Sequence, residues 1–78
     1  MAINKRYEER LTREIHEYLK TYGPTSARAI TEDLNPRYKG QLTTMSVVTI
    51  LKREKGHGRM REVAFLDKKM IIWGTNMG

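Results

Sequence analysis

The stretch Thr43-Thr44-Met45-Ser46-Val47-Val48-Thr49-Ile50-Leu51-Lys52-Arg53 decides the fold of this sequence. Val47, Ile50 and Leu51 recur at helical spacing, and small polar side chains lie among them. This spacing predicts a helix over about residues 43–55 that buries one side and exposes a small polar face. A threonine at its start is a suitable N-cap, and a glycine after its last lysine is the expected C-terminal stop.

Two further helices are predicted before this stretch. Apolar residues recur every three or four positions over about residues 4–22, with Glu, Arg and Lys on the other faces, until a Gly-Pro pair ends the pattern. A shorter helix is expected at about 26–34, with Thr25 or Ser26 as its N-cap. Asn35-Pro36 is expected to end it, because a residue before proline is disfavoured in the helical region.

After the decisive stretch the pattern changes to that of strands. Residues 59–66 and 70–73 are rich in β-branched, aromatic and long apolar residues, which predicts a tight hairpin over about 59–73. Its faces are expected to carry Val63, Phe65 and Ile72 on one side and Ala64, Leu66, Ile71 and Trp73 on the other. Because both faces are apolar, we expect one to be covered, either by the first helix or by a second subunit.

Three helices followed by a two-stranded antiparallel hairpin make an α+β chain that resembles a winged helix-turn-helix domain over roughly residues 8–73. The segment GPTSARAITEDLN resembles the second helix of that superfamily, and LTTMSVVTILKREKG is similar to its recognition helix. The Thr-Thr pair followed by Thr-Ile-Leu-Lys-Arg is also loosely similar to the repressors of penicillinase and copper-transport operons. The resemblance implies one winged helix domain over residues 1–78, with the hairpin as its wing.

Two features depart from the pattern of this superfamily. Glu54 occupies a position where leucine is usual, which predicts that the end of the third helix is less buried than in its relatives. The connector over residues 35–42 is longer than the turn of the simplest helix-turn-helix, which favours a winged variant with an extended turn.

Length and composition restrict the class of protein. With 78 residues the chain has room for one small core, so we expect a single domain that gains stability from dimerisation. It has no cysteine, which excludes disulfides and thiolate metal sites. Without a long apolar run or an apolar segment near the charged N-terminus, neither a membrane span nor a secretory signal is expected. We therefore expect a cytoplasmic, nucleoid-associated protein.

The net charge of +6 is concentrated in the middle of the chain. Residues 1–34 hold equal numbers of basic and acidic side chains, and so do residues 62–78. The window between them contains seven Lys or Arg and one Glu. This positive charge surrounds the helix predicted over about residues 43–55, which also carries small hydrogen-bonding side chains, and the combination indicates a DNA-binding surface.

The docking geometry of helix-turn-helix proteins places the N-terminal residues of the third helix at base edges in the major groove. The candidates for base contacts are Thr43, Thr44, Ser46 and Thr49, together with Arg53, which could reach a guanine. The candidates for phosphate contacts are Arg37, Lys39, Gln41, Lys52, Lys55, Arg59 and Arg61. Lys68 and Lys69 are expected at the wing tip, near the adjacent DNA backbone. The plainer interpretation is that Thr43 only caps the helix and that the charged residues form a solvated surface.

No reactive constellation accompanies these residues. His16 and His57 are far apart and lack cysteine partners, so we expect no metal, no cofactor and no enzymatic activity. The expected function is sequence-selective binding of double-stranded DNA by a transcriptional regulator of a prokaryote or its virus, acting as a homodimer through the first helix or the hairpin. One alternative is a protein-interaction module that uses Leu66, Ile71 and Trp73. Another is binding of single-stranded nucleic acid or RNA through exposed aromatics, with Tyr38 against a sugar-phosphate strand.

Overall fold

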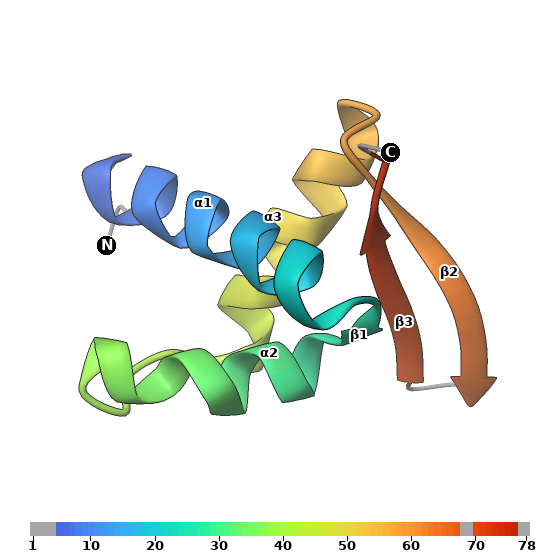
Figure 1. The fold of residues 1–78 in the computed structure, drawn as a ribbon. Helices are drawn as coiled ribbons and strands as arrows, with labels where there is room; N and C mark the ends of the chain where they lie inside the picture. The colour runs from blue at the N-terminus through green and yellow to red at the C-terminus, as the bar shows by residue number, and fades with distance from the viewer. Residues whose placement is uncertain (1–4, 68–69, 77–78) are drawn as a thin grey trace.

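The computed structural model describes residues 5–67 and 70–76. Its elements are α1 (Lys5–Tyr22), β1 (Thr25–Ser26), α2 (Ala27–Leu34), the 3-10 turn η1 (Asn35–Tyr38), α3 (Thr44–Gly56), β2 (Met60–Asp67) and β3 (Met70–Thr75). The three helices pack together, and the β2–β3 hairpin stands against one end of them (Figure 1). This is the predicted α+β arrangement of a small winged helix. None of the described helices is both long and apolar enough to cross a bilayer.

The core is formed by the apolar stripes of the three helices, by Tyr38 and Leu42 of the connector and by two residues of the hairpin. The buried apolar residues on the helices are Leu11, Ile15, Leu19, Ala27, Ile30, Leu34, Val47, Ile50 and Leu51. Met60 and Trp73 join them from the sheet, and Trp73 is only 2% exposed. The hairpin is therefore attached to the helices by a large buried aromatic side chain, and a second subunit is not required to cover it.

The sheet contains a strand that the sequence analysis did not predict. Its order is β1-β3-β2, so β3 is the central strand. Thr25 pairs with Trp73 and Ser26 with Ile72, both antiparallel. Ser26 then caps α2, because its side chain accepts a hydrogen bond from the backbone N–H of Ala29. One short segment thus connects the start of α2 to the hairpin.

The predicted faces of the hairpin are wrong. Ala64 lies opposite Ile72 and Phe65 opposite Ile71, whereas the simple alternation had grouped Phe65 with Ile72. The register shifts between Glu62 and Ala64 and again between Phe65 and Asp67. Each bulge places an extra residue on β2, and a one-residue slip moves every following side chain to the other face.

Helix α2 ends at Leu34, before Asn35-Pro36 as predicted, but the connector that follows is not extended. Asn35 keeps helical dihedral angles (φ −55°, ψ −38°) although Pro36 follows it, and the chain continues as η1. Asn35 stabilises this turn, because its carbonyl accepts from the N–H of Gly40 and its Oδ1 accepts from the N–H of Leu42 at 2.8 Å. The backbone then reverses through Lys39 and Gly40, both with positive φ.

Tyr38 is buried, so the expectation that it contacts a sugar-phosphate strand is wrong. Its hydroxyl donates to the carboxylate of Glu14, and its ring meets the edge of Tyr7 at a centroid distance of 5.3 Å. Burial and the hydrogen bond to Glu14 raise the pKa of Tyr38. The residue fixes η1 to α1 and contributes to the core rather than to a binding surface.

Candidate nucleic-acid interface

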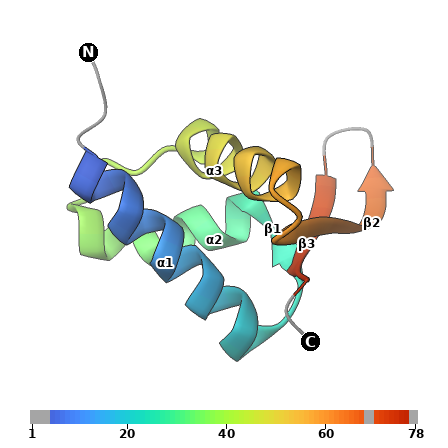
Figure 2. The same ribbon diagram turned by 90° about the horizontal axis from the view of Figure 1, so that it is seen from above.

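Helix α3 is anchored at its start by Thr43. The Oγ1 atom of Thr43 accepts a hydrogen bond from the backbone N–H of Ser46 at 3.1 Å, which satisfies one of the free donors at the helix N-terminus. Seen from above, α3 runs along one side of the molecule and α1 along the other (Figure 2). One side of α3 is therefore packed against the bundle, and its opposite side is available to a ligand.

The outward face of α3 carries small or unbranched side chains that are mostly neutral. Thr44, Met45, Thr49 and Lys52 are exposed on it, and Met45 is 74% exposed. Met45 is not among the base-edge candidates predicted from the sequence. A helical wheel could have found it, because Met45 lies opposite the stripe formed by Val47, Ile50 and Leu51.

The base-edge candidates lie together on this helix, and several of their hydroxyl groups already have partners. The hydroxyls of Thr43 and Ser46 lie 2.9 Å apart, and that of Thr49 donates to the carbonyl of Met45 at 2.8 Å. These local bonds occupy hydroxyl groups that could otherwise contact a ligand. The observed role of Thr43 is the N-cap.

Arg53 is held by helix α1 instead of pointing freely outward. It forms an ion pair with Glu8 and donates to Oγ1 of Thr12 at 2.8 Å. A contact between Arg53 and a guanine would have to replace these bonds, which come from residues distant in the sequence.

Three of the predicted phosphate contacts are also paired within the protein. Arg37 lies 3.2 Å from Glu14, Lys55 lies 2.9 Å from Glu62, and Arg59 binds Glu54. The pair of Lys55 and Glu62 is exposed and is worth little in free energy, whereas the carboxylate of Glu54 is buried. All three pairs reduce the positive potential that a DNA phosphate would meet.

The remaining predicted contacts are exposed and unpaired. Within residues 5–67 and 70–76, the side chains of Lys39, Gln41, Lys52 and Arg61 have no hydrogen-bond or ion-pair partner. Lys39 lies in the loop after η1, Lys52 on α3 and Arg61 on β2, so these three unpaired charges come from different parts of the fold. Lys68 and Lys69, predicted at the wing tip, lie outside the described residues.

Glu54 is buried, so the prediction of a less buried helix end is wrong. Its carboxylate accepts two hydrogen bonds from Arg59, at 2.9 and 3.1 Å, and lies 2.6 Å from Nε2 of His16. Burial alone would raise the pKa of Glu54, but the hydrogen bonds from Arg59 and His16 and the positive charge of Arg59 hold it below its ordinary value. This carboxylate joins α3, α1 and the start of the hairpin.

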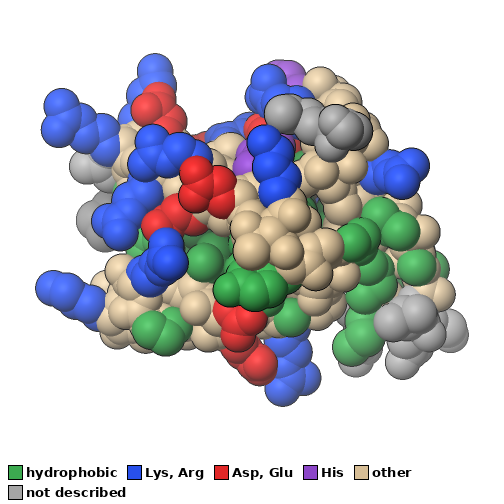
Figure 3. Space-filling view, in the orientation of Figure 1, with side chains coloured by type: hydrophobic (Ala, Val, Ile, Leu, Met, Phe, Trp, Pro, Cys, Tyr) green, Lys and Arg blue, Asp and Glu red, His purple; other side chains and the backbone are tan. Residues whose placement is uncertain are grey.

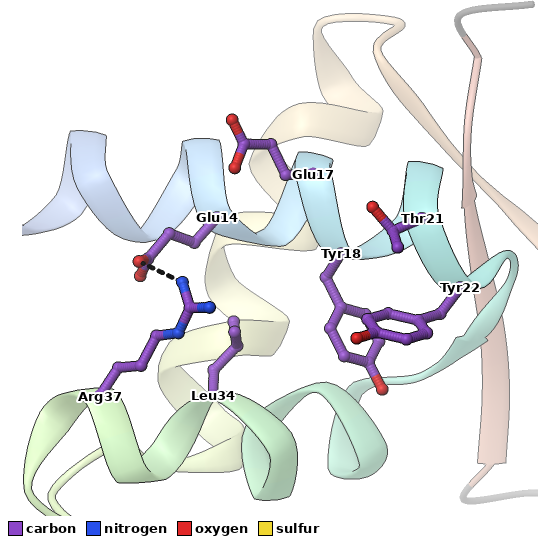
Figure 4. A pocket seen from close by; sticks show the side chains of 7 residues that line it. All are labelled: Glu14, Glu17, Tyr18, Thr21, Tyr22, Leu34 and Arg37. Atoms are coloured by element: carbon purple, nitrogen blue, oxygen red, sulfur yellow. Dashed lines mark hydrogen bonds and ion pairs between the residues drawn. The ribbon is translucent and has the colours of Figure 1, made fainter.

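A shallow pocket of about 160 Å³ lies between α1 and α2 (Figure 4). At one end the side chain of Arg37 points to Glu14, and at the other the rings of Tyr18 and Tyr22 lie side by side. The hydroxyl of Tyr18 donates to Asp33, and this bond raises the pKa of Tyr18 to about 12. Arg37 is thus committed to the α1–α2 surface, away from the outward face of α3.

A larger groove of about 400 Å³ separates α3 from the hairpin. Its wall on α3 consists of Thr44, Val48 and Lys52, and its other walls include Ile71 and Trp73. The groove is mostly apolar, with the free ammonium group of Lys52 at its boundary. Part of the outward face of α3 therefore forms one wall of the groove, and the wing forms another. No group of three or more His, Asp or Glu side chains with the arrangement of a metal site occurs among the described residues.

Fold and geometry together define a small winged-helix chain. The chain is similar to a solved structure of HOP2, whose description refers to DNA recognition and protein interaction domains and to homologous DNA pairing. The TM-score is 0.68 at 24% sequence identity, and the match covers 85% of this chain and 98% of the HOP2 chain. This similarity supports the winged-helix fold. It does not bear on the resemblance to the penicillinase and copper-operon repressors, which stays a prediction. No protein-family model and no curated protein sequence matches the chain.

Proposed function

We propose that this protein binds double-stranded DNA by placing the outward face of α3 in the major groove. The observation that carries the proposal is the exposed surface of that helix. Thr44, Met45 and Thr49 form a neutral surface small enough to approach base edges, and the free charge of Lys52 follows it directly. The structural similarity to HOP2, whose own domains include one for DNA recognition, adds support.

Phosphate contacts are assigned to the unpaired side chains. Lys39, Lys52 and Arg61 meet the DNA backbone, and Gln41 adds an uncharged donor. Each neutralised phosphate lowers log K by about 0.9 per log unit of salt, so three contacts predict a slope of about 2.7 per chain. If Arg37, Lys55 or Arg59 left its glutamate partner to bind a DNA phosphate, the dependence of log K on salt concentration would become steeper.

We propose a transcriptional regulator of a prokaryote or its virus that acts as a homodimer, without enzymatic activity. The homodimer forms through α1 or through the hairpin, over which hydrophobic side chains gather (Figure 3). Val63, Phe65 and Met70 are the exposed large hydrophobic residues of the hairpin. A dimer would bind paired half-sites about one helical turn of DNA apart.

The same exposed residues favour a second candidate function, protein interaction. The predicted interaction face of Leu66, Ile71 and Trp73 is not supported, because Trp73 is buried, Ile71 packs against the core and the side chain of Leu66 lies outside the described residues. Phe65, which is 64% exposed, is instead the centre of the apolar surface that a protein partner would cover.

The test is fluorescence anisotropy with a random-sequence duplex and with its separated single strand, at about 50 and 200 mM salt. We expect the duplex to bind more tightly, and Lys52→Ala to weaken binding to every sequence while lowering the salt slope by about 1. Lys20→Ala removes an equal charge from the last turn of α1 and serves as the matched control. Equal effects of the two variants would reject the assignment of α3. Tighter binding of the single strand would favour recognition by stacking, and binding of neither would favour the protein-interaction function.

A further inference from the structure

The outward face of α3 has an unusual chemistry for a surface that contacts bases. Its N-terminal half, from Thr44 to Thr49, contains no Arg, Lys, Asn, Gln, Asp or Glu. These are the side chains that recognise guanine, adenine or cytosine by hydrogen bonds in the major groove. Direct recognition by this half of the helix must therefore rely on hydroxyl and methyl groups.

The hydroxyl groups are largely occupied within the helix. Thr49 donates its hydroxyl proton to the carbonyl of Met45, and the hydroxyls of Thr43 and Ser46 are paired with each other. The hydroxyl of Thr44 can donate or accept with several bases, so it adds little discrimination. The apolar groups of this surface that can distinguish one base pair from another are the methyls of Thr44 and Thr49 and the thioether of Met45.

The charged and amide side chains near this half of the helix do not form part of it. Arg53 is engaged by Glu8 and Thr12. Lys52 lies further along the helix, toward its C-terminal end, and Gln41 lies before the N-cap, so neither belongs to the half of the helix that leads into the groove. The apolar character continues sideways into the groove beside α3, where Val48 is half-buried.

We infer that α3 selects DNA through the C5-methyl groups of thymine, so that its preferred sites are rich in A·T pairs where the helix lies. Thymine is the base that presents a methyl group in the major groove, and threonine methyls pack on it. The inference rests on the DNA binding proposed above and specifies the kind of site. Removing one methyl from such a contact weakens binding about fourfold, as expected for one buried methyl group.

The experiment begins with selection of bound duplexes from a random pool. Each thymine of a selected duplex is then replaced singly by uracil, which removes only the C5-methyl, and affinities are measured by fluorescence anisotropy. We expect selected sites to contain thymine, and one or more replacements to weaken binding about fourfold each. At a contacted position changed to a G·C pair, 5-methylcytosine should bind more tightly than cytosine by a similar factor.

Variants of the protein locate the effect on α3. Thr49→Ser removes the methyl but keeps the hydroxyl that donates to Met45, so it should abolish the uracil effect at one position while the unfolding midpoint stays near that of the wild type. Gln41→Ala should weaken thymine and uracil duplexes alike. Equal affinity for thymine and uracil duplexes at every position would overturn the inference and leave DNA binding intact. Failure to bind any duplex would overturn the proposed function and the inference together.

Discussion

Nε2 of His16 lies 2.6 Å from Oε1 of Glu54 and links the middle of α1 to the last turns of α3. The glutamate side chain is 3% exposed, and its carboxylate also receives both hydrogen bonds from Arg59. Because a buried carboxylate is costly without such partners, the three residues form one unit. This unit joins α3 to α1 and to the start of the hairpin.

The first prediction concerns the chemistry at position 54. Glu54→Gln should lower the free energy of unfolding by about 1 to 3 kcal/mol. The amide has one acceptor oxygen in place of two, and its NH2 group would face the side chains that now contact the carboxylate, Arg59 and His16. Glu54→Leu should cost less, since Arg59 is half-exposed and can return to water. Urea denaturation measures both. A leucine variant less stable than the glutamine variant would contradict this account.

The lowered pKa of Glu54 also predicts that the free energy of unfolding depends on pH in the acidic range. The pKa of Glu54 is lowered on folding, so its contribution is complete above the pKa of the unfolded chain, about 4.3, and is lost as the pH falls through the lower pKa of the folded state. The stability difference between the wild type and Glu54→Leu should therefore change as the pH falls below about 4.3. Glu14, whose pKa is lowered by Tyr38 and Arg37 against the effect of burial, should cause a remaining loss in both proteins.

The second prediction concerns the pair formed by Arg53 and Glu8. Glu8→Gln removes the charge that holds Arg53 and should strengthen binding of duplex DNA, with the salt slope steeper by about 1. Fluorescence anisotropy over a salt series measures the change. Glu17→Gln makes the same change of charge in the pocket between α1 and α2 and is the control. If both variants strengthen binding equally, the gain comes from net charge and not from the release of Arg53.

The third prediction concerns the cap of α3. Thr43→Ala should lower the free energy of unfolding by about 1 kcal/mol, because the N–H of Ser46 loses its acceptor. Thr43→Ser keeps an acceptor and should stay close to the wild type. Thr44→Ala, at an exposed neighbouring position, is the matched control in thermal denaturation. Equal losses for Thr43→Ala and Thr44→Ala would show that the cap contributes nothing.

The fourth prediction concerns the close approach of the two hairpin strands. A Cβ at Gly74 would lie 2.8 Å from Cγ2 of Val63 and 3.6 Å from Cγ of Pro24. Gly74→Ala should therefore cost about 1 to 2 kcal/mol, as the valine or the strand is displaced. In a Val63→Ala background the same change should cost less, which a double-mutant cycle in urea measures. An identical cost in both backgrounds would exclude this contact as the cause.

The helices could be predicted because their information is local. Apolar spacing and capping residues identified α1, α2 and α3 to within a residue or two of the ends that the structure describes. β1 could not be predicted, because a two-residue strand has no periodicity and is defined by its pairing with Trp73. The bulges of the hairpin were missed for a related reason, since alternation along one strand does not show where the partner strand slips.

The sequence identifies candidate residues for a binding site, but it does not show which of their charges are paired within the protein. The sequence places the base-edge candidates on one helix and the positive residues around it. Which of those residues are free depends on tertiary contacts, such as Glu8 with Arg53 and Glu14 with Arg37, which no local pattern indicates. Glu54 was misjudged similarly, because only the fold brings His16 to its carboxylate.

In the described sheet, β2 has a partner strand on one side only, and its other edge is open. An open edge of this length, with exposed Val63 and Phe65, can act as a template for aggregation with other chains. The two bulges bend and twist the strand, and the charges of Arg61 and Glu62 lie beside the first bulge. The two bulges, which made the register unpredictable from the sequence, therefore also disfavour the pairing of β2 with strands of other chains.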